Sequence, residues 1–130
     1  MSTPVPDRLS VLIVEPDEDT ADTLADVLAL YGHQARVAGG CKGAGEAVRA
    51  FTPDVVIQDV ALPDGDGYWL AVALSNLLPR HTVFIALTSR QPVDERCRLA
   101  GFRRYLVKPV PPAVVAELLD VYAARRGTPR

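Results

Sequence analysis

The sequence predicts an α/β protein with a doubly wound, parallel five-stranded sheet, on two observations. Five strand-like segments alternate with five helix-like segments, and such alternation produces right-handed crossovers and a parallel sheet covered on both faces. The first, third and fourth strand-like segments are apolar throughout, whereas the second and fifth are more polar and suit the sheet edges. The strand order that satisfies both is 2-1-3-4-5, which is the flavodoxin-like (βα)5 three-layer sandwich.

The chain begins with a segment that we expect to be a tail. Residues 1–7 contain two prolines and no periodicity, so we expect one folded domain over residues 8–124 and a second tail at 125–130. Residues 11–14 form the first apolar strand, and an acidic run after it is typical of a helix start. That first helix ends at Gly32 and has a stripe of apolar residues at helical spacing: Ala21, Leu24, Ala25 and Leu28.

The second and third strands flank a glycine-rich segment. Residues 34–38 alternate polar and apolar side chains, as a strand with one solvated face does. Four glycines over residues 39–45 predict a loop, followed by a short helix at about 45–51. Residues 55–57 are an unbroken apolar run, which predicts a strand buried on both faces.

The second half continues the same alternation. We expect an apolar helix over residues 68–78, a buried strand over 83–87, a polar helix over 92–100 and a more polar strand over 103–107. The last helix has one apolar face, formed by Val114, Val115, Leu118, Val121 and Tyr122.

Composition excludes several functions. The net charge of −2 argues against non-specific binding to nucleic acid or to an anionic membrane. No apolar run approaches the roughly 18 residues of a membrane span, and the N-terminus has no apolar signal core, so a cytoplasmic location is expected. Cys41 and Cys97 match no metal or redox spacing and are expected to be unrelated reduced thiols. His33 and His81 are expected at the surface.

Polar side chains follow the carboxyl ends of the central strands. Glu15 and Asp17 follow the first strand, Asp59 the third, Thr88 the fourth and Lys108 the fifth. In a sheet of this topology these ends meet at one edge, where ligands bind. Crowded carboxylates suit a hard cation such as Mg²⁺, while a lysine and a hydroxyl suit phosphoryl oxygens. An aspartate can accept a phosphoryl group covalently, and the arrangement therefore indicates phosphoryl transfer.

These motifs closely resemble the receiver domain of two-component response regulators. The resemblance covers about Arg8 to Tyr122 and depends on Val-Leu-Ile-Val-Glu, Gln-Asp-Val-Ala-Leu-Pro-Asp-Gly-Asp-Gly-Tyr, Ile-Ala-Leu-Thr-Ser and Tyr-Leu-Val-Lys-Pro. It implies that Asp59 is the phosphoacceptor, Thr88 the switch hydroxyl and Tyr105 the switch aromatic. It further implies that Lys108 binds the phosphoryl group.

The resemblance also implies a metal site and partners. Mg²⁺ would be held by Glu15, Asp59 and the backbone carbonyl of Ala61, with Asp17 as a further candidate, and the Lys108-Pro109 peptide bond would be cis. A histidine kinase or a phosphotransfer protein would be the donor. A downstream protein or a second copy would bind the face of the fourth helix, fifth strand and fifth helix, where we expect these charged residues: Arg96, Arg103, Arg104, Glu117 and Asp120. We expect no enzymatic activity beyond self-catalysed phosphoryl acceptance and hydrolysis.

One position departs from the family pattern. The family has two adjacent acids after the first strand, and the second binds the metal, whereas this chain has Glu15-Pro16. Two interpretations follow: water and Glu15 replace the missing ligand, or Mg²⁺ binding and phosphorylation are impaired. The second would make the chain a pseudo-receiver, a constitutive protein-binding module. A third alternative, a small flavin-binding protein of the same topology, is disfavoured because no phosphate-cradling loop follows the first strand.

Overall fold

The computed structural model describes residues 9–89 and 94–126 of the 130-residue chain. Its main sheet has five parallel strands in the order β2-β1-β3-β6-β7, which confirms the predicted order and the flavodoxin-like fold. The predicted strands correspond in chain order to β1 (Ser10–Val14), β2 (Gln34–Ala38), β3 (Val55–Asp59), β6 (Val83–Thr88) and β7 (Phe102–Val107).

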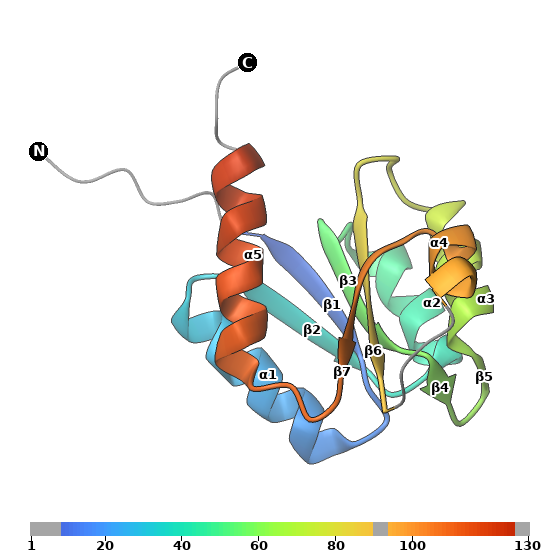
Figure 1. Cartoon of the computed structure of the whole chain (residues 1–130), viewed down its shortest axis with the longest axis horizontal. Helices are drawn as coiled ribbons and strands as arrows, with labels where there is room; N and C mark the ends of the chain where they lie inside the picture. Colours follow the sequence, from blue (N-terminus) through green and yellow to red (C-terminus); the bar gives the residue numbers. More distant parts are fainter. Residues whose placement is uncertain (1–8, 90–93, 127–130) are drawn as a thin grey trace, which may run out of the picture.

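Helices cover both faces of this sheet (Figure 1). One face carries α1 (Glu18–Leu30) and α5 (Pro112–Arg126), which pack against each other. The other carries α2 (Cys41–Ala50), α3 (Gly67–Ser75) and α4 (Asp94–Ala100). None of the described helices is long and apolar enough to cross a membrane.

Alternate residues of the central strands fill two cores. Ile13, Ile57 and Ile85 are fully buried under α1 and α5, and their neighbours Leu12 and Val56 are fully buried on the opposite face. Full burial of such a side chain contributes roughly 1.5–3 kcal/mol, so these short strands hold the sheet centre together. The edge strands β2 and β7 have mostly exposed or half-buried side chains, as the sequence predicts.

The structure corrects the start of the second helix. The glycine-rich segment is largely helical, because α2 begins at Cys41 rather than at about Gly45. Gly43 packs closely on β2: a Cβ at this position would lie 3.3 Å from the Ala38 Cβ. The N-cap residue Gly40 has no side chain with which to cap the helix, and Asp64 supplies two hydrogen bonds in its place.

A small antiparallel hairpin follows the third strand and was not predicted. It pairs β4 (Ala61–Leu62) with β5 (Gly65–Asp66) and leads directly into α3. Gly67 packs against the start of this hairpin, since a Cβ there would lie 2.4 Å from the Asp59 carbonyl oxygen. Helix α3 ends at Ser75, three residues before the predicted end at Leu78.

His33 is buried, and the prediction that it lies at the surface was wrong. Its Nδ1 accepts the Leu9 amide N–H at 3.2 Å, so Nε2 carries the proton and donates to Asp120 Oδ1 at 2.9 Å. Because both ring nitrogens have partners, the ring can be buried at the junction of α1, β2 and α5. His81 is exposed as expected.

The predicted N-terminal tail and the predicted helix start at residues 92 and 93 lie outside the described residues. Helix α5 continues to Arg126, so its last turn includes the first two residues of the segment predicted as a tail.

Candidate functional site

The predicted site residues lie at one edge of the sheet because the strands are parallel. Glu15 directly follows β1, Asp59 ends β3, Thr88 ends β6 and Lys108 directly follows β7. β1 pairs with β3, and β6 pairs with both β3 and β7, so the four strand ends lie in one row along the sheet. The fold therefore gathers residues that are far apart in the chain, as the order of strands predicts.

Lys108 joins the two carboxylates of this edge. Its ammonium donates to Asp59 Oδ2 at 2.9 Å and also to Glu15 Oε1. The Glu15 side chain is 1% exposed and that of Asp59 10%, while that of Lys108 is 28% exposed. Two carboxylates and one ammonium leave a net negative charge in a partly desolvated site, which attracts a further cation or a cationic donor.

Burial and charge change the pKa values in this cluster. Burial raises the pKa of Asp59 to about 6; the Lys108 hydrogen bond opposes this shift, and the nearby Glu15 carboxylate adds to it. For Lys108, desolvation acts to lower the pKa, but the hydrogen bonds to Glu15 and Asp59 outweigh it, and the pKa is raised. At neutral pH Asp59 is thus mostly ionised and Lys108 is charged.

Asp17 lies outside the cluster. Its carboxylate caps α1 by accepting the Thr20 amide N–H at 3.2 Å and the Thr20 hydroxyl, and these bonds lower the pKa of Asp17. Its own amide N–H donates to Glu15 Oε2 at 3.1 Å and so helps to fix the Glu15 side chain. Asp17 was a candidate metal ligand, but its carboxylate is bound to Thr20 in the α1 cap. It contributes to the site through its backbone amide, which holds the Glu15 side chain.

The other predicted residues surround the Asp59–Lys108 pair. Thr88 is buried, and its carbonyl accepts the Lys108 amide N–H at 2.7 Å. Ala61 is exposed on β4, two residues after Asp59. Tyr105 lies on β7 opposite Ala86 and packs half-buried against the core under α3 and α4. The Lys108–Pro109 peptide bond is cis.

The oxygen donors fit a magnesium ion only with substantial hydration. Glu15 and Asp59 are the two carboxylates present, and Ala61 adds a carbonyl on the adjoining hairpin. Mg²⁺ is commonly bound by one or two carboxylates while it keeps several waters, so this set is chemically suitable. Among the described residues, however, no three acidic, histidine or cysteine side chains are placed to hold a metal, because Pro16 has no carboxylate and Asp17 caps α1.

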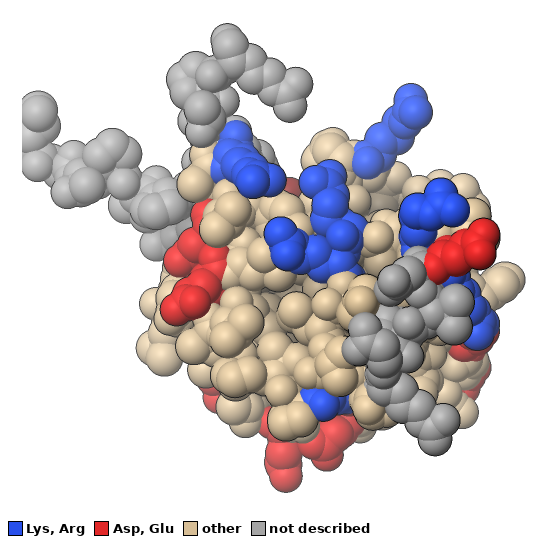
Figure 2. All heavy atoms as spheres, in the orientation of Figure 1, with Lys and Arg blue, Asp and Glu red and all other residues tan. Residues whose placement is uncertain are grey.

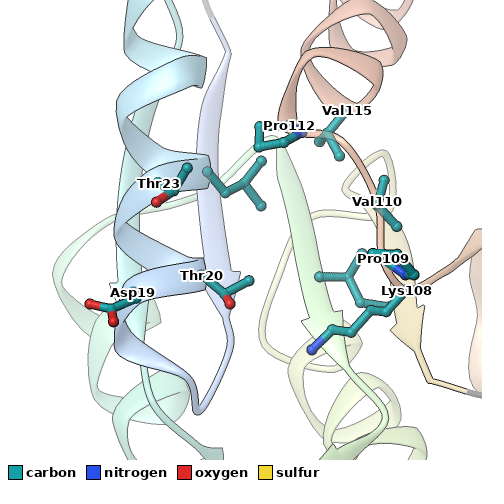
Figure 3. A pocket seen from close by; sticks show the side chains of 10 residues that line it. Asp19, Thr20, Thr23, Lys108, Pro109, Val110, Pro112 and Val115 are labelled. Atoms are coloured by element: carbon teal, nitrogen blue, oxygen red, sulfur yellow. The ribbon is translucent and has the colours of Figure 1, made fainter.

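An open cleft of about 580 Å³ leads to Lys108 (Figure 3). Thr20 and Thr23 of α1 line one side, and Pro109, Val110 and Val115 line the other. The cleft is mainly apolar and Asp19 also lines it, whereas Lys108 is the one residue that it shares with the acid–lysine cluster.

Charged residues around α4, β7 and α5 differ in part from the expectation. Arg96 pairs with Asp66 and stacks 4.2 Å from the Tyr68 ring centroid, whereas Asp120 binds His33. Arg103 and Arg104 are exposed on β7, and basic side chains gather there and over the neighbouring ends of α4 and α5 (Figure 2). Glu117 of α5 is exposed as well, so this surface has charges of both signs.

Two acids of the β4–β5 hairpin were missed as structural elements of the site. Asp64 binds the first two amides of α2, and Asp66 caps α3 through the Tyr68 amide and pairs with Arg96 of α4. The sequence feature that pointed to Asp64 is Gly40 at the N-cap of α2. Because glycine has no side chain, the first amides of α2 need an acceptor from elsewhere in the chain.

Fold and site together define a doubly wound α/β protein with an acid–lysine cluster at the carboxyl ends of its strands. Residues 11–120 match the family model of the response regulator receiver domain. The chain belongs to this family.

Two curated proteins illustrate what the chain is similar to in sequence. The chain is 32% identical over 118 residues to the uncharacterized 14.6 kDa protein in the sodA1 3′ region of Leptolyngbya boryana, covering 88% of this chain and 90% of that protein. It is 30% identical over 120 residues to the sensor histidine kinase RcsC of Salmonella typhimurium, covering 92% of this chain but 13% of RcsC. The chain thus spans a small part of some relatives and nearly all of another.

A solved structure shows the same fold. A two-component response regulator from Clostridium difficile superposes with a TM-score of 0.85 at 20% sequence identity, covering 93% of this chain and all of that chain.

Proposed function

We propose that this receiver domain accepts a phosphoryl group on Asp59 from a histidine kinase or a phosphotransfer protein. The observation that supports it best is the 2.9 Å contact between Lys108 Nζ and Asp59 Oδ2 at the carboxyl ends of the parallel strands. An ionised carboxylate held against a fixed ammonium combines a nucleophile with a charge that can stabilise the incoming phosphoryl oxygens.

The transfer is a substitution at phosphorus. A carboxylate oxygen of Asp59 attacks the phosphorus of the donor phosphohistidine, and the P–N bond breaks as the new P–O bond forms. The donor imidazole leaves with the electron pair of the broken bond. Lys108 then exchanges its contact with the carboxylate for one with a phosphoryl oxygen, and the Thr88 hydroxyl donates to another. When bound by Glu15, Asp59 and the Ala61 carbonyl, Mg²⁺ would neutralise part of the developing negative charge.

The phosphoryl group then shifts the domain between two states. Thr88 ends β6 and Lys108 directly follows β7, the strand that carries Tyr105, and a new dianion next to them makes contacts that differ between the states. We propose that the resulting change reaches the surface of α4, β7 and α5, where a downstream protein or a second copy binds. Catalysis is limited to self-catalysed phosphoryl acceptance and hydrolysis.

The cation site favours a second candidate, a pseudo-receiver that binds its partner without phosphorylation. Lys108 already bridges Glu15 and Asp59, Pro16 supplies no carboxylate, and Asp17 is held in the α1 cap. All three observations reduce the affinity expected for Mg²⁺.

Intact-mass measurement separates the two candidates. The protein is incubated with acetyl phosphate and MgCl₂, and the same is done with Asp59→Asn. Gain of one phosphoryl group by the wild type and none by the variant supports the phosphoacceptor. No gain by the wild type at any Mg²⁺ concentration used supports the pseudo-receiver, and equal gain by both proteins contradicts the assignment of Asp59.

A further inference from the structure

Asp64 forms the cap of a helix that begins 23 residues before it in the chain. Its Oδ1 accepts the Cys41 amide N–H at 2.7 Å and its Oδ2 accepts that of Lys42 at 3.0 Å. Both amides are in the first turn of α2, where such groups lack an acceptor within the helix. The two backbone bonds lower the pKa of Asp64, so the carboxylate is charged and complements the helix dipole.

Glycines on both sides make room for this contact. A Cβ on Gly40 would lie 2.5 Å from Asp64 Oδ1, and a Cβ on Gly65 would lie 2.9 Å from Cys41 Sγ. A side chain at either glycine would displace Asp64 or Cys41 from its observed position, so both glycines favour the close approach of the hairpin turn to the start of α2.

The hairpin held by this contact adjoins the candidate cation site. It contains two residue pairs, Ala61 with Asp66 and Leu62 with Gly65, and a hairpin of this size is marginally stable on its own. Its residues are exposed or half-buried, so apolar packing fixes it weakly. At its base, the Gly67 amide N–H donates to the Val60 carbonyl at 2.9 Å, and at its tip Asp64 is the tie to α2.

We propose that Asp64 is a positioning residue: by fixing the β4–β5 hairpin on α2, it holds the Ala61 carbonyl in place for Mg²⁺. The proposal rests on the proposed function, because it assumes that function's cation. A site that lacks one acid has fewer ligands, so its affinity depends more on how well the remaining ones are preorganised.

The chain offers a matched control in Asp54. Asp54 Oδ2 also accepts a backbone amide distant in the chain, that of Ser10 at 2.8 Å, but at the opposite end of β3 from Asp59. Asp54→Ala thus removes a comparable carboxylate-to-amide bond away from the site. Asp64→Asn keeps one neutral acceptor and serves as the conservative variant.

The test is a titration of each protein with MgCl₂ alone, followed through the Val60 and Ala61 amide signals in NMR spectra, with urea unfolding of the same samples. Asp64→Ala is expected to weaken Mg²⁺ binding about tenfold, at the lower end of what loss of an outer-sphere partner causes. The Mg²⁺ affinity of Asp64→Asn is expected to lie between those of Asp64→Ala and the wild type. Asp54→Ala is expected to lower stability without changing Mg²⁺ affinity.

Three results would overturn the proposal: unchanged affinity in Asp64→Ala, an equal loss in Asp54→Ala, or no Mg²⁺-dependent shift of the Ala61 amide in the wild type. Hydrogen exchange at the Cys41 and Lys42 amides verifies, without metal, that the variant has lost the cap. The titration contains no phosphoryl donor, so failure of Asp59 to become phosphorylated does not affect its result.

Discussion

Lys108 Nζ lies 2.9 Å from Asp59 Oδ2, although the two residues are 49 positions apart in the chain. The same ammonium binds Glu15, so one cation separates two largely buried carboxylates. This geometry lets Asp59 remain mostly ionised at neutral pH even though burial raises its pKa to about 6. The nucleophilic form of Asp59 therefore depends on Lys108.

Removal of that ammonium is expected to suppress phosphorylation. In Lys108→Ala, the Glu15 and Asp59 carboxylates lose their shared partner, the pKa of Asp59 rises further, and no cation meets the phosphoryl oxygens. The initial rate of phosphorylation by acetyl phosphate at pH 7 is expected to fall by about 10²-fold, as on loss of a preorganised charge-stabilising donor. Lys42→Ala changes the chain's other lysine, which is exposed on α2, and is the control. Equal rates for the two variants would remove Lys108 from the mechanism.

The raised pKa of Asp59 predicts that the folded protein loses stability as pH rises through about 6. Its pKa of about 6 in the folded protein exceeds the ordinary 3.8, so the folded state binds the proton more tightly than the unfolded state does. The group therefore contributes stability that is fully present below about pH 4 and is lost as pH rises through about 6. Asp59→Asn removes this titration, and at pH 7.5 without metal it is expected to be more stable than the wild type by on the order of 1–2 kcal/mol.

Urea unfolding at pH 4 and pH 7.5 measures this difference. The two proteins are expected to have similar stability at pH 4, where Asp59 is protonated, and to diverge as pH rises. A gap that stays constant with pH, or an Asn variant that is less stable at pH 7.5, would show that Asp59 is not destabilised by its charge.

The buried His33 gives a prediction about folding that is separate from the site. In His33→Leu, the Leu9 amide and the Asp120 carboxylate both lose their partner, and the amide stays buried. Loss of a buried partner costs about 1–3 kcal/mol, so the free energy of unfolding is expected to fall by about 2 kcal/mol. His81→Leu, at an exposed position, is the control and is expected to change stability by less than about 0.5 kcal/mol. Similar losses in the two variants would contradict the role of the His33 hydrogen bonds.

The sheet could be predicted because each strand shows its burial in a short run of neighbouring residues. Apolar runs such as residues 11–14 and 55–57 report burial on both faces, and parallel topology then brings their carboxyl ends together. That reasoning placed Glu15, Asp59 and Lys108 at one edge without any knowledge of their contacts. Side-chain contacts between distant elements could not be predicted in this way: His33 is buried because it binds Asp120 of α5, and Asp64 of the hairpin caps α2.

The start of the second helix was predicted too late because of its glycine content. Gly43 and Gly45 lower helix propensity by roughly 1 kcal/mol each relative to alanine, which favours a loop on local grounds. Tertiary contacts outweigh this cost, since Gly43 allows close packing on Ala38 and Asp64 caps the helix from the hairpin. The β4–β5 hairpin was not predicted because each of its strands has two residues, which is too short to show strand periodicity.

The substitution Pro16→Asp decides how much the missing acid matters. Pro16 is exposed next to Glu15, so an aspartate there can be accommodated at the surface and adds the adjacent acid that the family pattern has. With a third carboxylate near Glu15 and Asp59, Mg²⁺ affinity is expected to rise about 10- to 100-fold, the range that metal-site support commonly contributes. The measurement is a MgCl₂ titration followed by NMR, with phosphorylation by acetyl phosphate measured in parallel.

Pro16→Ala is the control, because it removes the proline without adding a charge and so separates loss of the proline from gain of the carboxylate. If Pro16→Asp binds Mg²⁺ no better than Pro16→Ala, the proline is not the cause of weak binding, and the explanation must lie in the Lys108 bridge between Glu15 and Asp59.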